Sequence, residues 1–182
     1  MNKKDIFRPY ATVALSALKE LEKIEQKLCN PINKKDKKLL SRQSAGMKHL
    51  IDRCFRLTGD FMPIHISKKA KKYCEDNNLG DLFSIGWDKQ AKFEGKNNRA
   101  DCNLKHEHKK PVSDLSKSLR KARNINNAIS IFESQEIVWV TKEEDKKLPK
   151  NNRLDSDKIY EDAEITIIRN EHPVGHLFTR II

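Results

Sequence analysis

The 182-residue sequence lacks the features that mark several classes of protein. Its four cysteines, at positions 29, 54, 74 and 102, form no CxxC pair, so we expect reduced thiols and neither a zinc knuckle nor a zinc ribbon. No apolar run approaches the roughly 20 residues that a membrane-spanning helix needs, and the amino terminus lacks the apolar stretch of a signal peptide. These absences favour a cytoplasmic protein without a membrane partner.

The chain also lacks the motifs of nucleotide-driven enzymes and serine hydrolases, since it has no GxGxxG, no Walker-type GK[ST] loop and no GxSxG elbow. Aromatic residues make up 7% of the chain, too few for the stacking surface of an aromatic-rich single-strand binder. Charged residues make up 35%, above the roughly 25% of a typical globular domain. We therefore expect a modest core and a heavily ionised surface.

The net charge of +11 is distributed unevenly along the chain. Residues 1–110 hold 25 Lys and Arg against 14 Asp and Glu, whereas residues 111–182 hold 12 of each. A positive field of this size attracts polyanions, of which nucleic acid is the commonest in a cell. The sequence therefore predicts a nucleic-acid partner for the first part of the chain, with a merely solubilising lysine-rich surface as the alternative.

Apolar periodicity predicts an α+β fold in a single domain. Steps of three and four predict amphipathic helices over 9–28 and 36–57, which would pair as a basic hairpin within residues 1–60. Residues 61–182 form the predicted mixed part, with further helices and a small, mainly antiparallel sheet towards the C-terminus. Its predicted elements are a strand edge at 64–66, a helix capped by Ser67, helices from 113 or 114 to 123 and over 125–132, a strand at 137–141, a helix over 142–148 capped by Thr141, a loop over 149–157, and strands at 165–168 and 176–182.

The midpoint of the chain, Asp101–Pro111, holds two histidines, two carboxylates and three lysines within eleven residues. A metal ligand, a general base and phosphate-binding cations would meet here without help from distant sequence. The alternative is a solvated charged strand or loop that leads into a helix at Pro111. A zinc site from Cys102, His106 and His108 has suitable ligand types, but its near-sequential spacing strains a tetrahedral geometry.

The string Glu107-His108-Lys-Lys-Pro111 resembles the first motif of the HNH, or ββα-metal, nucleases. In that family the acidic residue binds a divalent cation and the adjacent histidine activates the attacking water. The resemblance therefore implies a metal-dependent endonuclease with Glu107 as metal ligand and His108 as general base. Asparagines at 124, 126 and 127 lie about where the family has its middle Asn, and no third histidine follows them until His172.

Glu107-x-Lys109 alternatively has the form of the D/E-x-K half of restriction-type nucleases. That pattern needs an upstream aspartate, and Asp88, 19 residues earlier, has a suitable spacing, whereas Asp101 requires a very tight turn. Two carboxylates would then hold Mg²⁺ while Lys109 polarises the water. The candidate catalytic residues are thus Glu107, His108 and Lys109, and the candidate magnesium ligands are Glu107, Asp101 and Asp88.

Two further interpretations involve no catalysis: binding of nucleic acid alone, and docking on an acidic protein partner as an accessory subunit or inhibitor. The sequence leaves open whether the nucleic acid is DNA or RNA, whether the chain is an oligomer, and whether His172 and His176 lie near the midpoint. The expected phosphate contacts all lie upstream of Pro111 and come from Lys37, Lys38, Arg42, Arg53, Arg56, Lys96, Arg99, Lys105 and Lys110.

Overall fold

The computed structural model of the chain describes residues 3–62, 64–150, 153 and 155–169. It has an α+β fold made of two compact units. A helical unit comprises the residues up to Thr58 together with Leu115–Ser134, and a sheet unit comprises Gly59–Asp114 and the residues from Gln135 onward. None of the helices in the described ranges is long and apolar enough to cross a membrane. The cytoplasmic location stays a prediction.

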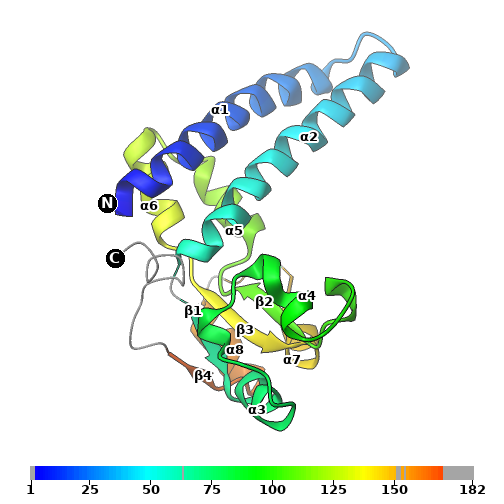
Figure 1. Ribbon diagram of the computed structural model, residues 1–182. Helices are drawn as coiled ribbons and strands as arrows, with labels where there is room; N and C mark the ends of the chain where they lie inside the picture. The colour runs from blue at the N-terminus through cyan, green and yellow to red at the C-terminus, as the bar shows by residue number, and fades with distance from the viewer. Residues whose placement is uncertain (1–2, 63, 151–152, 154, 170–182) are drawn as a thin grey trace. The chain divides into compact units, whose positions relative to one another are not determined.

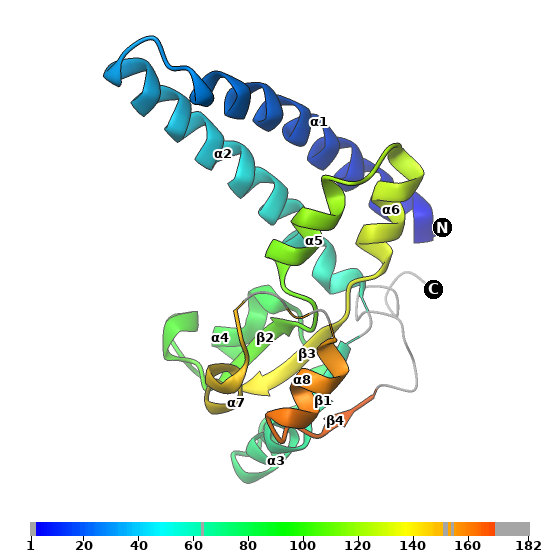
Figure 2. The same ribbon diagram turned by 180° about the vertical axis from the view of Figure 1, so that it is seen from behind.

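The helical unit is built on an antiparallel hairpin of α1 (Lys3–Cys29) and α2 (Lys34–Thr58), drawn in blue and cyan in Figures 1 and 2. Both predicted helices are present. However, α1 begins six residues before Pro9, which lies inside it. Asn33 starts α2, because its side-chain oxygen accepts a hydrogen bond from the Asp36 amide at 2.9 Å. The buried face of α1 repeats at steps of three and four, as in Ala11, Ala14, Leu18 and Leu21.

Residues 115–134 join this hairpin although the sequence places them in the mixed part. The stretch contains most of α5 (Val112–Leu119) and all of α6 (Ile125–Glu133). The rings of Phe132 in α6 and Phe55 in α2 stack with their centroids 4.3 Å apart. Arg120 makes a two-pronged contact with Glu25 of α1, at 3.0 and 3.1 Å. The helical unit is therefore assembled from two separate stretches of sequence.

The sheet unit contains four strands in the order β2-β3-β1-β4, visible in Figure 1. They are β1 (Ile64–Ser67), β2 (Leu104–His108), β3 (Ile137–Thr141) and β4 (Ile167–Ile168). Two of the three pairings are antiparallel and one, between β1 and β3, is parallel. Residues 64–66, predicted as a strand edge, instead lie inside the sheet, and the predicted strand over 176–182 lies outside the described residues.

The two faces of the sheet are covered by different helices. On one face Val138 and Val140 pack with Tyr160 of α8 (Ser156–Asp162), which Figure 2 shows in front of the strands. On the other face lie Ile66 and Trp139, and Ile66 lines a pocket together with Cys74 of α3 (Lys68–Asp76); the short α4 (Gln90–Phe93) follows later in the chain. Because β3 is central and four of its five residues are buried, it is the core of this unit.

Two of the predicted helix caps in the sheet unit, Ser67 and Thr141, are confirmed, whereas α5 already begins at Val112, so the predicted cap at Ser113 or Asp114 is wrong. The Ser67 side chain accepts a hydrogen bond from the Ala70 amide and starts α3. Thr141 starts α7 (Lys142–Lys147) in a capping box with Glu144. The Glu144 carboxylate also accepts a hydrogen bond from Ser67 at 2.6 Å and is 2% exposed. It therefore joins the starts of two helices, which explains this acidic residue without a bound cation.

Candidate functional site

The midpoint cluster is divided between the two faces of the sheet. Residues of β2 alternate in direction, and their partners in β3 identify the faces: His106 pairs with Trp139, and Glu107 pairs with Val138. His106 and His108 therefore face the side of Trp139, whereas Glu107 faces the side of α8. The predicted ligand Glu107 and the predicted base His108 thus point in opposite directions, while Glu107 and Lys109 share a face.

Glu107 is held by Arg153, which comes shortly before α8 in the chain. The Arg153 Nη1 lies 2.8 Å from Glu107 Oε1 and also donates to the backbone oxygen of His108 at 3.1 Å. Arg153 is only 1% exposed, and its Nε donates to the Pro149 oxygen at 2.6 Å. Burial raises the pKa of the Glu107 carboxyl, and the charge of Arg153 opposes this increase. The result is a charged pair anchored on two backbone carbonyls.

Lys109 is the centre of a second set of ion pairs on the same face. Its Nζ lies 2.9 Å from Glu136 and 2.8 Å from Asp157 of α8, and its side chain is 5% exposed. Burial alone would lower the pKa of Lys109, but the hydrogen bonds to Asp157 and Glu136 together raise it. Glu136 also lies 3.5 Å from His65 Nε2 in β1. Lys109 therefore joins β2, the start of β3 and α8.

We expect Glu136 to make stability depend on acid pH. Its hydrogen bonds to His65 and then to Lys109 lower its pKa from 4.5 to about 2. The folded state thus favours the charged Glu136 carboxylate. Its contribution to the free energy of unfolding is complete above the pKa of the unfolded state, 4.5, and is lost as the pH falls from 4.5 towards 2. Glu136→Gln should flatten the dependence of the urea midpoint on pH in this window. A slope equal to that of wild type contradicts this role, and Glu161→Gln is the charge-matched control.

The predicted magnesium ligands do not form a recognisable metal group. Among the described residues, no three His, Cys, Asp or Glu side chains converge in a group that could hold a metal ion. Asp88 and Asp101 are exposed, and the Asp101 carboxylate is bonded to the Asn98 amide. The charged groups that act on Glu107 are Arg153, Asp145 and Lys150, and neither predicted aspartate is among them. Magnesium binding stays a prediction.

The helical unit presents a second candidate surface, a line of basic side chains on α2. From Lys34 to Arg56 these side chains follow one another at steps of four, four, seven, four and three residues. At 3.6 residues per turn, they lie within an arc of about 100° around the helix axis. From the first to the last they span 23 residues, a rise of about 33 Å along the helix. The buried Ile51, Cys54 and Phe55 lie on the opposite side. This surface, here named the basic stripe, consists of Lys34, Lys38, Arg42, His49, Arg53 and Arg56, all exposed.

The basic stripe is only partly engaged in ion pairs. Within the described residues, Lys34, Lys38 and Arg42 form no ion pair, whereas Arg56 lies 2.7 Å from Asp52. Lys34 and His49 belong to the stripe although the sequence did not single them out, and the predicted Lys37 is exposed outside it. The other predicted phosphate-binding residues, Lys96, Arg99, Lys105 and Lys110, belong to the sheet unit.

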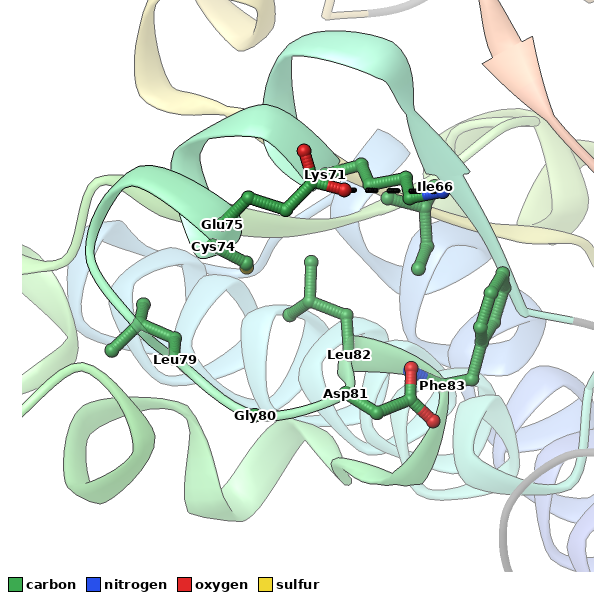
Figure 3. A pocket seen from close by; sticks show the side chains of 9 residues that line it. All are labelled: Ile66, Lys71, Cys74, Glu75, Leu79, Gly80, Asp81, Leu82 and Phe83. Atoms are coloured by element: carbon green, nitrogen blue, oxygen red, sulfur yellow. Dashed lines mark hydrogen bonds and ion pairs between the residues drawn. The ribbon is translucent and has the colours of Figure 1, made fainter.

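A small apolar pocket in the sheet unit is shown in Figure 3. Leu79, Leu82 and Cys74 line it, and an ion pair between Lys71 and Glu75, 3.9 Å apart, lies beside them. Burial raises the pKa of the Cys74 thiol to about 11, so the thiolate that nucleophilic chemistry needs is scarce. The pocket has a volume of about 250 Å³, which is below the roughly 300 to 1,000 Å³ of small-molecule sites. None of the predicted site residues lines this pocket.

Comparison of the chain with protein-family models, with curated proteins and with solved structures finds no match. The function is therefore inferred from the midpoint cluster and the basic stripe. Four residues of the charged clusters, His65, Glu136, Arg153 and Asp157, were not predicted. Arg153 and Asp157 gave no local signal, because isolated charges in a polar segment are usually solvated. The steps of three and four in α2 were a usable signal for Lys34 and His49.

Proposed function

We propose that the chain binds nucleic acid without cleaving it and that the basic stripe of α2 is its phosphate-binding surface. The observation that carries this proposal is the line of five cations and His49 along the exposed face of α2, opposite its buried face. Phosphate contacts by Lys and Arg supply most of the affinity for nucleic acid regardless of sequence. A stripe about 33 Å long is able to follow several consecutive phosphates.

The contacts of Glu107 and Lys109 favour binding over the metal-dependent endonuclease. A magnesium ligand needs an available carboxylate, and a lysine that polarises water needs an available ammonium group. Here Glu107 is paired with Arg153, and Lys109 is paired with Glu136 and Asp157. The endonuclease stays a prediction, and a nucleic-acid partner is common to both proposals.

Binding should depend steeply on salt, with a slope set by the basic stripe. For duplex DNA, four to six phosphate contacts reduce affinity by about 10² to 10³ between roughly 50 and 200 mM salt. Lys38→Ala combined with Arg42→Ala removes two contacts and should make the slope of log K against log salt shallower by about 2. Fluorescence anisotropy of labelled DNA and RNA duplexes measures both quantities, and the comparison of the two duplexes identifies the preferred nucleic acid.

The matched control combines Lys146→Ala and Lys158→Ala, which removes the same charge from exposed positions of α7 and α8. This control should retain the wild-type slope. If both double variants made the slope shallower by the same amount, net charge alone would explain the effect. If the wild-type chain did not bind at about 50 mM salt, the proposal would be refuted. Cleavage of the duplex with magnesium that Glu107→Gln abolishes would instead support the endonuclease.

A further inference from the structure

A row of exposed apolar residues runs along α2 beside the basic stripe. Leu39, Leu50 and Leu57 are 56%, 39% and 43% exposed. At 3.6 residues per turn they share one helix face with Gly46, between the basic stripe and the buried face. We name Leu39, Gly46, Leu50 and Leu57 the leucine row. The other large hydrophobic side chains that are exposed in the described ranges are Val13 and Ile32.

The leucine row has the spacing of a coiled-coil seam. Together with Gln43 and Arg53 it occupies positions 39, 43, 46, 50, 53 and 57, which alternate steps of four and three. In an antiparallel pair centred on residue 48, position 39 faces position 57 of a second copy, and position 46 faces position 50. Leucine then meets leucine at both ends, Gln43 meets Arg53, whose stem lies at the border with the basic stripe, and Leu50 meets Gly46 near the middle. The seam is thus complementary to itself, as a two-fold interface requires.

Gly46 favours a second copy over another partner as the occupant of this face. Glycine is the weakest helix former after proline, yet Gly46 is exposed in the middle of the 25-residue α2. A Cβ atom added there would meet no atom within 4 Å, so packing within the described chain does not require a glycine. Opposite Leu50 of a second copy, the absent side chain leaves the space that this leucine fills.

The basic stripe determines when two copies can pair. An antiparallel helix pair brings the same edge of each helix together, so the two stripes lie side by side and repel each other. One helix face per copy also makes a small contact, at the weak end below about 1,200 Å². We propose that two copies pair antiparallel through the leucine row when a nucleic acid bridges their basic stripes. The role of the nucleic acid in this inference rests on the proposed function.

The mass of the full chain should therefore change with its ionic surroundings. By sedimentation equilibrium we expect a monomer at low salt, because the stripes repel each other. We expect a dimer at about 1 M salt, where the Debye length falls to about 3 Å and the repulsion is screened. We also expect two chains per duplex at low salt with a short DNA or RNA duplex. The high-salt measurement tests the leucine row without any nucleic acid.

Exchange of the two central residues tests the antiparallel register. Leu50→Ala leaves a hole and Gly46→Leu overfills one, so each should raise the dissociation constant of the dimer by about tenfold or more. The double variant Gly46→Leu/Leu50→Ala again places a leucine opposite a small residue and should restore the dimer. Val13→Gln, which changes a 45% exposed residue on α1, should leave it unchanged. Circular dichroism confirms that each variant remains helical.

The outcomes separate this inference from the proposed function. A monomer at high salt, with one chain per duplex, refutes pairing through the leucine row even if the duplex binds. A dimer at high salt without any binding of the duplex refutes the nucleic-acid function and its control of pairing, and leaves the row as a dimer contact. Loss of the dimer in both single variants without recovery in the double variant contradicts the antiparallel register. A chain that stays monomeric but binds an acidic leucine-containing helical peptide through Leu50 assigns the row to another partner and overturns the inference.

Discussion

Replacing Arg153 by methionine should lower the free energy of unfolding by about 3 to 5 kcal/mol, because removing one member of a buried ion pair leaves the other charge uncompensated. The Glu107 side chain is 23% exposed, so water replaces the guanidinium poorly. The backbone oxygens of His108 and Pro149 also lose their donor. Both tryptophans lie in the sheet unit, so urea unfolding followed by tryptophan fluorescence measures the loss there.

The pH dependence of Arg153→Met distinguishes lost charge compensation from lost packing. The pKa of Glu107 is already raised by burial, and removal of Arg153 takes away a charge that lowers it. A raised carboxyl pKa means that the folded state binds the proton more tightly, so the variant should regain stability as the pH falls towards 4.5. Glu107→Gln combined with Arg153→Met should be less unstable than Arg153→Met alone. If both variants lose the same stability at every pH, the pair has no electrostatic role.

Truncating Phe132 to alanine should cost the helical unit about 3 to 5 kcal/mol, the usual range for a buried phenylalanine. Phe132 is fully buried and stacks on Phe55, which is also fully buried. This contact is part of what joins residues 115–134 to the hairpin. The expected result is a lower urea midpoint for the loss of helical signal in far-ultraviolet circular dichroism.

Ile131→Ala is the matched control for Phe132→Ala, since Ile131 is a half-buried neighbour in the same helix. Ile131→Ala should lower the urea midpoint by much less than Phe132→Ala, because it removes less buried apolar surface. The assignment of residues 115–134 to the helical unit would be wrong if Phe132→Ala shifted the tryptophan transition and left the main helical transition unchanged.

The parts of this structure that were predictable from the sequence depend on neighbours a few residues apart. The helix periodicity of α2 and the caps at Ser67 and Thr141 are local patterns, so they were predicted correctly. Glu144 was also within reach of local reasoning, since a glutamate three residues after Thr141 is the signature of a capping box. These features follow from helix geometry alone.

The arrangement around Glu107 was not predictable, because it depends on contacts between distant residues. Arg153 reaches Glu107 from 46 positions away, out of the stretch 149–157 that was predicted as a loop and whose last two residues instead begin α8. The parallel pairing of Ile64 with Ile137 joins residues 73 positions apart. The order of apolar and polar residues within each strand does not indicate which other strand it pairs with. The sequence of the midpoint cluster therefore did not indicate the ion pairs that engage Glu107 and Lys109.

The central position of β3 has a consequence for the order in which the chain folds during synthesis. β1 and β2 both pair with β3 and not with each other. The sheet therefore cannot assemble until Ile137–Thr141 has left the ribosome. By then every residue of the helical unit, which ends at Ser134, has already been made. The helical unit is thus able to fold first, while the apolar strands Ile64–Ser67 and Leu104–His108 wait unpaired, a state in which exposed strands are prone to aggregate.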